Sequence, residues 1–132
     1  MNEISETLDI LYGDGIPMHG AKVDQDEAVR IVQDRYPYAG YCIVSGWEWI
    51  DLDVTPKQLE ELTKTQRQPV IIYAKDVIYD SRRRWDVGDF VRTSPLCKFE
   101  DGFIFKTFNT IYILLGDGIK KRASLEAIGR IF

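Results

Sequence analysis

The apolar run Val70-Ile71-Ile72-Tyr73-Ala74 constrains the fold more than any other segment of this 132-residue chain. Consecutive apolar residues rich in β-branched side chains leave no polar face, which is typical of a strand buried on both sides. Pro69 precedes the run, and Val77-Ile78-Tyr79 extends it past the polar pair Lys75-Asp76. Other elements must therefore cover both faces of this segment, and we expect it to be the central strand of a sheet.

Two segments carry the start and stop signals of helices. Residues 24–36 begin with a capping aspartate three residues before a glutamate, continue with apolar residues at helical spacing, and end before Pro37. The second segment runs from Thr55 to about Gln66 and starts Thr-Pro-Lys-Gln, where threonine caps and proline presets φ. Apolar spacing in residues 4–12 predicts a further short helix or arm.

Strands are predicted between and after these helices. The segment from Tyr41 to Leu52 reads as one strand broken near Gly46, because it is rich in β-branched and aromatic residues. The Asp101-Gly102 pair suits a two-residue hairpin turn, in which both residues need positive φ. The later predicted elements are strands over Val87–Thr93, Ile111–Leu115 and Ile119–Lys121, the hairpin over Phe99–Ile104, and a helical turn over Ser124–Ile128.

The order of these elements predicts an α+β fold. N-terminal helices would pack on a mostly antiparallel sheet, and a C-terminal β-meander would approach closure into a small barrel. No linker or repeat divides the chain, so residues 1–132 are expected to form a single domain. Within it, residues 1–20 form an N-terminal helix or arm, residues 21–80 an α/β half, and residues 85–132 the meander with its short helical turn.

Composition excludes several classes of protein. The 45% hydrophobic and 29% charged content is that of a soluble globular chain rather than a disordered one. No apolar stretch approaches the roughly 20 residues of a membrane span, and the first residues lack a signal-peptide pattern, so we expect a cytoplasmic protein that does not bind membranes. Cys42 and Cys97 are too few for a disulfide framework, and both are expected to be reduced core thiols.

Cofactor and catalytic motifs are missing. The Gly-Asp-Gly sequences at residues 13–15 and 116–118 lack the lysine and hydroxyl residue of a phosphate loop and read as turns. His19 lies in a loop flanked by proline and glycine, outside any nucleophile motif. We therefore predict no catalytic residue, no metal site and no cofactor.

Charge is distributed unevenly. Residues 1–66 hold 5 Lys and Arg against 13 Asp and Glu, hence −8, whereas residues 67–132 hold 12 against 8, hence +4. This asymmetry either steers partners or is satisfied internally when the halves pack together. The modest total of −4 disfavours a dedicated duplex-DNA binder.

Two clusters are candidate sites. In the first, Trp47 and Trp49 would share a strand face, and two exposed indoles beside acids would form a platform for a small ligand; buried core aromatics are the alternative. Asp51 and Asp53 also share a face, where they could hold a cation or stabilise the start of the following helix. This ligand-binding set comprises His19, Trp47, Glu48, Trp49, Asp51 and Asp53.

The second cluster is basic. Arginines beside an aromatic residue on a small barrel are a pattern of single-stranded nucleic-acid binders, which pair phosphate contacts with base stacking. The same residues also suit a protective sheet edge or a contact to the acidic first half. This nucleic-acid-binding set comprises Arg82, Arg83, Arg84, Trp85, Lys120, Lys121 and Arg122.

Three segments carry a resemblance to a known family. They read VGDFVRTS at residues 87–94, NTIYILLG at residues 109–116 and ASLEAI at residues 123–128. Over this C-terminal third to half, the chain resembles an uncharacterised family of short bacterial and prophage-borne proteins. The resemblance implies a compact domain in a mobile-element context and carries no site residues across.

These observations order the functional hypotheses. The first is a non-enzymatic module that binds an unidentified protein partner, because no catalytic constellation exists and charge is polarised. The alternatives are a nucleic-acid-binding small barrel and, after it, a small-ligand binder or hydrolase around the tryptophans. A homodimer through a sheet edge is also compatible with the apolar strands.

Overall fold

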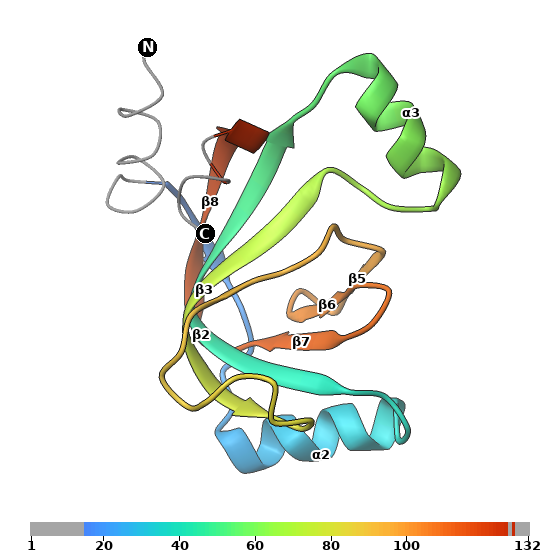
Figure 1. Ribbon diagram of the computed structural model, residues 1–132. Helices are drawn as coiled ribbons and strands as arrows, with labels where there is room; N and C mark the ends of the chain where they lie inside the picture. Colours follow the sequence, from blue (N-terminus) through green and yellow to red (C-terminus); the bar gives the residue numbers. More distant parts are fainter. Residues whose placement is uncertain (1–14, 127, 129–132) are drawn as a thin grey trace.

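Strand β2 (Tyr41–Asp53) is the centre of the fold in the computed structural model, which describes residues 15–126 and residue 128. The eight strands form one mixed sheet that curls into a half-barrel (Figure 1). β2 runs antiparallel to β3 along one edge, and along its other edge it runs parallel first to β7 and then to β8. The elements are β1 (Ile16–His19), α2 (Gln25–Arg35), β2, α3 (Pro56–Lys64), β3 (Val70–Asp80), β4 (Val91–Arg92), β5 (Lys98–Glu100), β6 (Ile104–Lys106), β7 (Ile111–Leu114) and β8 (Asp117–Ser124).

A change of partner divides β2. Its first part, Tyr41–Val44, pairs with β7, and its second part, Glu48–Asp53, pairs with β8, so these two strands follow one another along the same edge. Trp47 fills the break between them. Its Nε1 donates to the carbonyl oxygens of Leu115 at 3.1 Å and Gly116 at 3.3 Å, and the side chain is 1% exposed. The indole thus gives the Leu115 carbonyl a donor, and it shares the Gly116 carbonyl with the backbone nitrogen of Gly20, which donates to it at 2.9 Å.

Gly118 makes the close approach of this indole possible. A Cβ at residue 118 would lie 2.4 Å from both Cδ2 and Cε3 of Trp47. No real side chain fits at that distance, so the position requires glycine for space and not for its backbone angles. The turn predicted at residues 116–118 is wrong for Asp117 and Gly118, because both belong to β8 and pair with β1.

The faces of the sheet are buried by separate clusters. The alternation of side chains along β2 and β3 sends one set into the curl and the other outward. The register of β2 on β3 shifts between Ile43 and Val44, whereas it is unchanged across Gly46, which has φ of 59°. The cluster inside the curl comprises Cys42, Val44, Trp47, Val70, Ile72, Ala74, Val77, Val91, Leu96, Phe105, Tyr112 and Leu114.

Helix α2 covers part of the outer face. Asp24 caps it by accepting a bond from the Glu27 backbone at 2.8 Å, and Ala28 and Val32 pack on outward side chains of β2 and β7. Helix α3 has a complete capping box between Thr55 and Gln58, but none of its residues is buried. Figure 1 shows α3 projecting at the end of the sheet opposite α2. No helix within residues 15–126 is long and apolar enough to cross a membrane.

Local predictions are confirmed and several pairings are corrected. Both predicted helices are present, and a hairpin turns at Asp101-Gly102 with φ of 53° and 78°. Its loop has three residues rather than the predicted two, because Glu100 pairs with Ile104. Val70–Ala74 is buried on both faces, but the central strand is β2, since β3 has only the two-residue β4 on its far edge. The expected break near Gly46 is a bend in a continuous strand.

The prediction of a C-terminal meander is wrong about which strands pair. β7 and β8 do not pair with each other, because both lie parallel to β2, which makes the sheet mixed. The strand expected over Val87–Thr93 shrinks to Val91–Arg92, and Val87 is 77% exposed. Residues 16–19 form an edge strand on β8 that we did not predict. The helix expected over residues 4–12 lies outside the described residues, whereas Leu125, Glu126 and Ile128 are helical.

Replacing Gly118 with alanine tests the close approach to Trp47. We expect Gly118→Ala to lower the free energy of unfolding by about 3 kcal/mol, the upper end of the range for overpacked cores, because backbone and indole must separate. Gly102→Ala is the control: Gly102 has φ of 78° and nothing within 4 Å of an added Cβ, so only a left-handed backbone cost of about 1 kcal/mol is expected. Chemical denaturation measures both, and equal losses would contradict the tight contact.

Candidate functional site

An ion-paired row joins β2 to β8. Lys121 Nζ lies 2.8 Å from Glu48 Oε1, Lys120 Nζ lies 3.5 Å from Asp51 Oδ2, and Arg122 pairs with Asp53. The acids come from the acidic first half of the chain and the bases from the basic second half. The parallel pairing of β2 with β8 thus satisfies much of the charge asymmetry internally, and Arg35 with Asp101 adds another pair between the halves.

The pair between Glu48 and Lys121 is buried. Each side chain is 3% exposed, and no described residue donates a conventional hydrogen bond to Glu48 Oε2. Both charges have left water, so each depends on the other for compensation. The pair therefore holds β8 against β2, so Glu48 and Lys121 have a structural role.

The predicted ligand platform is part of the interior. Trp47 and Trp49 do share a face, but it is the packed face, where the Trp49 ring lies 4.8 Å from Phe99 and 5.6 Å from Phe105. Trp49 Nε1 donates to Asp51 at 3.2 Å. The two indoles therefore do not form an exposed platform, and the acids near them are paired with β8.

His19 lies at the exposed edge strand. Its Nδ1 is 2.9 Å from Asp117 Oδ1, and the hydrogen bond from His19 lowers the pKa of Asp117. Both side chains are mostly exposed, and neither belongs to a cluster with a nucleophile. Across residues 15–126, no group of three or more His, Cys, Asp and Glu side chains could hold a metal ion.

The arginine turn is fixed by one of its own members. Buried Asp80 accepts bonds from Arg84 through its backbone nitrogen at 2.6 Å, Nε at 3.2 Å and Nη2 at 2.8 Å. Arg84 Nη1 also donates to Thr110 Oγ1 at 2.6 Å, and the guanidinium carbon lies 4.6 Å from the Trp85 ring centroid. The hydrogen bond to Asp80 raises the pKa of Arg84. Arg84 therefore clamps the turn to the loop before β7.

The basic set separates into structural and available members. Arg84, Lys120, Lys121 and Arg122 are ion-paired within the protein, and Trp85 packs against the cluster inside the curl. Arg82 and Arg83 are exposed and have no ion-pair partner among residues 15–126 and 128. The structure thus leaves two adjacent arginines of the seven predicted residues available for a ligand.

A hollow of about 330 Å³ lies beside Arg82. Its other walls come from the end of α2, from β6 and from the loop that follows it, and the principal side chains are those of Tyr36, Lys106, Phe108 and Asn109. Lys106 Nζ lies 4.4 Å from the Tyr36 ring centroid and 3.7 Å from Glu100 Oε1. Sequence analysis missed these residues, because three separate segments supply them and none carries a motif.

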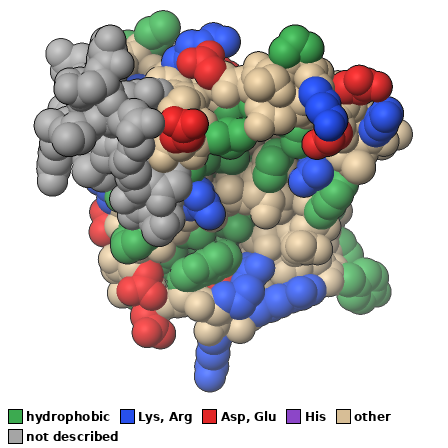
Figure 2. All heavy atoms as spheres, turned by 45° about the horizontal axis from the view of Figure 1, so that its top comes forward, with side chains coloured by type: hydrophobic (Ala, Val, Ile, Leu, Met, Phe, Trp, Pro, Cys, Tyr) green, Lys and Arg blue, Asp and Glu red, His purple; other side chains and the backbone are tan. Residues whose placement is uncertain are grey.

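A second surface lies between α3 and the sheet. It consists of two adjoining hollows of about 200 and 320 Å³, which share Leu52, Pro95 and Leu125. Gln58, Glu61 and Leu62 of α3 line the smaller one. Figure 2 shows apolar side chains exposed among charged ones across the face it presents. We refer to the two hollows together as the α3 groove.

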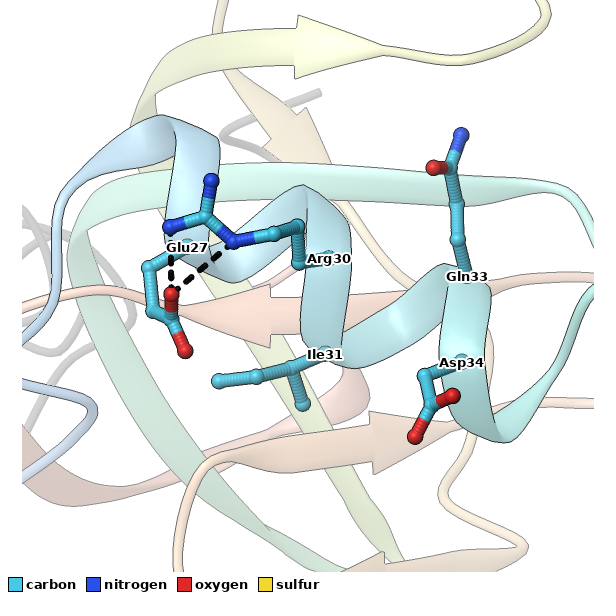
Figure 3. A pocket seen from close by; sticks show the side chains of 5 residues that line it. All are labelled: Glu27, Arg30, Ile31, Gln33 and Asp34. Carbon is cyan, nitrogen blue, oxygen red and sulfur yellow. Dashed lines mark hydrogen bonds and ion pairs between the residues drawn. The ribbon is translucent and has the colours of Figure 1, made fainter.

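Another hollow, of about 540 Å³, lies on α2 (Figure 3). All of its lining side chains come from that one helix, and Glu27 accepts a bond from Arg30 Nε at 3.1 Å. Gln33 and Asp34 point away from this pair. The side chains do not converge on a common point, so this hollow is not a candidate site.

The two thiols differ in burial. Cys42 is buried, and desolvation raises its pKa to about 12; Cys97 is half-buried, and desolvation raises its pKa as well. The thiolate is the nucleophilic form, so neither cysteine is activated at neutral pH. The expectation of reduced thiols agrees with both being free, although Cys97 is not a full core residue.

Comparison with known proteins gives one match. A family model described as a domain of unknown function, DUF6957, matches residues 19–130. The match starts at the last residue of β1 and spans both helices and all the later strands, so it reaches well beyond the C-terminal half. No curated protein and no solved structure matches the chain.

Removing the buried cation tests the structural role of Lys121. We expect Lys121→Met to lower the free energy of unfolding by about 3–5 kcal/mol, because the Glu48 charge stays buried without it. The double variant Glu48→Met/Lys121→Met should recover most of that loss. Arg122→Met is the exposed control and should cost less than about 1 kcal/mol. Denaturant unfolding measures the free energy of unfolding of each variant. A loss for Lys121→Met no larger than that for Arg122→Met would show that the pair is dispensable.

Thiol titration tests the environments of the cysteines. In the native protein near neutral pH, we expect a disulfide reagent to modify Cys97 slowly and Cys42 only after unfolding, because burial raises both pKa values and excludes the reagent from Cys42. Cys97→Ser should abolish the native reaction. Persistence of that reaction would mean that Cys42 is accessible.

Proposed function

The chain belongs to the DUF6957 family, a domain of unknown function, and for this member of it we propose a non-enzymatic module that binds a protein partner in the α3 groove. The observation that carries this proposal is helix α3, which is well formed although none of its residues is buried. Nine-residue helices are marginal in water and normally depend on packing of an apolar face. The apolar side of α3 is thus available for a partner.

The apolar residues of α3 lie where a partner could reach them. Leu59 is 44% exposed, and Leu62, one turn further, lines the groove. Leu125 stands on the opposite wall and is 43% exposed. The groove therefore continues from α3 across the end of the sheet and offers apolar contacts along its length, which supports docking of an apolar segment.

The charges at the groove are mixed, because Glu61, Arg67 and Arg92 all line it. Lys64 pairs with Glu60, and Arg67 Nε donates to Thr65 while its guanidinium stacks on Phe108. Glu61 lines the groove and has no ion-pair partner within the part of the chain that the structure describes. We therefore propose an apolar partner segment that places one Lys or Arg against Glu61 and keeps its other basic residues away from Arg67 and Arg92.

The origin and location of the chain belong to the same proposal. The sequence resembles bacterial and prophage-borne proteins, and small proteins of that kind often act by binding a macromolecule of the host or of a competitor. A host protein is thus the proposed partner. A cytoplasmic location agrees with both cysteines being free.

Introducing a negative charge at the apolar residues Leu59 and Leu125 tests this function. We expect Leu59→Glu and Leu125→Glu to reduce capture of the partner from nuclease-treated bacterial lysate, because each places a carboxylate against its apolar segment. Val87→Glu is the matched control, since Val87 is 77% exposed and lies outside the groove. Mass spectrometry quantifies capture, and a photo-crosslinker at residue 59 must join the same protein. The purified partner should then bind each groove variant at least about tenfold more weakly, a loss of 1.4 kcal/mol.

Three results would contradict the proposal. One is the failure of any protein to depend on Leu59 and Leu125, and another is capture that Val87→Glu reduces equally. The third is a crosslinked product that contains only two copies of this chain, which would make the groove a homodimer interface. Circular dichroism of each variant confirms that α3 and the sheet are intact.

A further inference from the structure

We propose that the hollow beside the arginine turn binds a nucleotide unit, with Arg82 and Lys106 holding the phosphate and Phe108 stacking on the base. This site, which we call the Arg82 hollow, does not depend on the protein partner proposed above. It comprises Arg82, Lys106, Tyr36, Phe108 and Asn109 around a volume of about 330 Å³. The positive charge, the aromatic wall and the rigidity of the hollow together indicate this class of ligand.

The positive charge of the hollow is not neutralised. Arg82 has no ion-pair partner among the residues that the structure describes. Lys106 shares Glu100 with Lys98, whose Nζ lies 3.6 Å from the same carboxylate oxygen. Two lysines on one glutamate leave a net positive charge, to which Arg82 adds another. An oxyanion with two charges suits such a site, and the planar guanidinium matches phosphate geometry.

The Glu100 carboxylate is itself engaged. The Tyr36 hydroxyl donates to it, and this hydrogen bond lowers the pKa of Glu100. The carboxylate is therefore ionised and held by Tyr36, Lys98 and Lys106, and it orients Lys106 over the Tyr36 ring at 4.4 Å. Glu100 positions one of the two cations at the hollow.

The backbone of Gly40 positions the other cation. A Cβ at residue 40 would lie 2.6 Å from Nε and 2.9 Å from Cζ of Arg82, so the guanidinium lies directly against this glycine. Gly40 is buried, and any side chain there would push Arg82 away from its place. The absence of a side chain at residue 40 thus leaves room for the Arg82 guanidinium at the wall of the hollow.

The aromatic wall is exposed and oriented. Phe108 is 60% exposed, and the Arg67 guanidinium carbon lies 5.0 Å from its ring centroid. An aromatic ring held in this way is suited to stacking with a nucleic-acid base, an interaction that tolerates any base. Asn109 lies beside Phe108 in the lining and can donate or accept hydrogen bonds at a base or phosphate edge.

The two sides of the hollow are locked together. Arg84 is bonded to Asp80 beneath the arginine turn and to Thr110 at the end of the loop that carries Phe108. That loop is closed by the bond from the Thr107 nitrogen to the Thr110 carbonyl at 2.9 Å. Arg82 and Phe108 are thus held on rigid supports, so binding costs little ordering of the protein.

Fluorescence anisotropy and calorimetry test the proposal with two probes. The first is adenosine 5′-monophosphate, and the second is a labelled single-stranded DNA of about ten nucleotides, within the site size of small binding folds. We expect Arg82→Gln to weaken binding about tenfold or more, as loss of a charged hydrogen bond does. Phe108→Ala should weaken it about five- to hundredfold, and Gly40→Ala should weaken it by displacing Arg82.

Arg83→Gln is the matched control. Arg83 is the adjacent exposed arginine, it has φ of 54° and it does not line the hollow, so the variant removes the same charge without touching the site. We expect it to weaken binding less than about threefold. In DNA binding, Arg82→Gln should also reduce the salt slope by about 1.

The two probes distinguish the source of the nucleotide. Equal affinity per site for the two probes indicates that the ligand is a free nucleotide. Tighter, salt-dependent binding of the DNA indicates that the ligand is a single-stranded nucleic acid. Either result supports the site. Binding of neither probe at physiological salt would overturn it. Equal losses with Arg82→Gln and Arg83→Gln would overturn it as well. Leu59→Glu should bind both probes normally, which separates this site from the α3 groove.

Discussion

The insertion of Trp47 where β2 changes partners is the contact on which the rest of the sheet depends. Two parallel strands can follow one another along one edge only if the break between them is filled and its carbonyl groups are satisfied. The Trp47 ring fills the break by packing against Gly118. Its Nε1 donates to the Leu115 and Gly116 carbonyls, and the second of these also accepts from the Gly20 nitrogen. With this contact in place, β8 lies in a register that brings its bases to the acids of β2.

That register also decides which charges remain for function. The bases of β8 are committed to Asp51, Glu48 and Asp53, so the second basic cluster stabilises the sheet. The first cluster is divided within one turn: Arg84 is held by Asp80, whereas Arg82 and Arg83 form no ion pair with any residue that the structure describes. A net charge summed over the sequence conceals this division, because identical neighbouring residues carry out different roles.

Much of the local structure could be predicted, since its causes are local. The Asp24 and Thr55 caps, the Asp101-Gly102 turn and the buried run of β3 each depend on residues a few positions apart. The partners of β2 could not be predicted, because the contacts that select β7 and β8 over a hairpin lie far apart in sequence. The Arg82 hollow could not be predicted for the same reason, since the end of α2, β6 and two loops each supply part of it.

The two proposed surfaces meet at one residue. Arg67 lines the α3 groove, and its guanidinium lies over the ring of Phe108, which forms a wall of the Arg82 hollow. A base that stacks on Phe108 and a partner that enters the groove therefore both act on the environment of Arg67. If both ligands bind, thermodynamic linkage requires that any effect of one on the affinity of the other be reciprocal. The contact between Arg67 and Phe108, at 5.0 Å from guanidinium carbon to ring centroid, is the place in the structure where such an effect would arise.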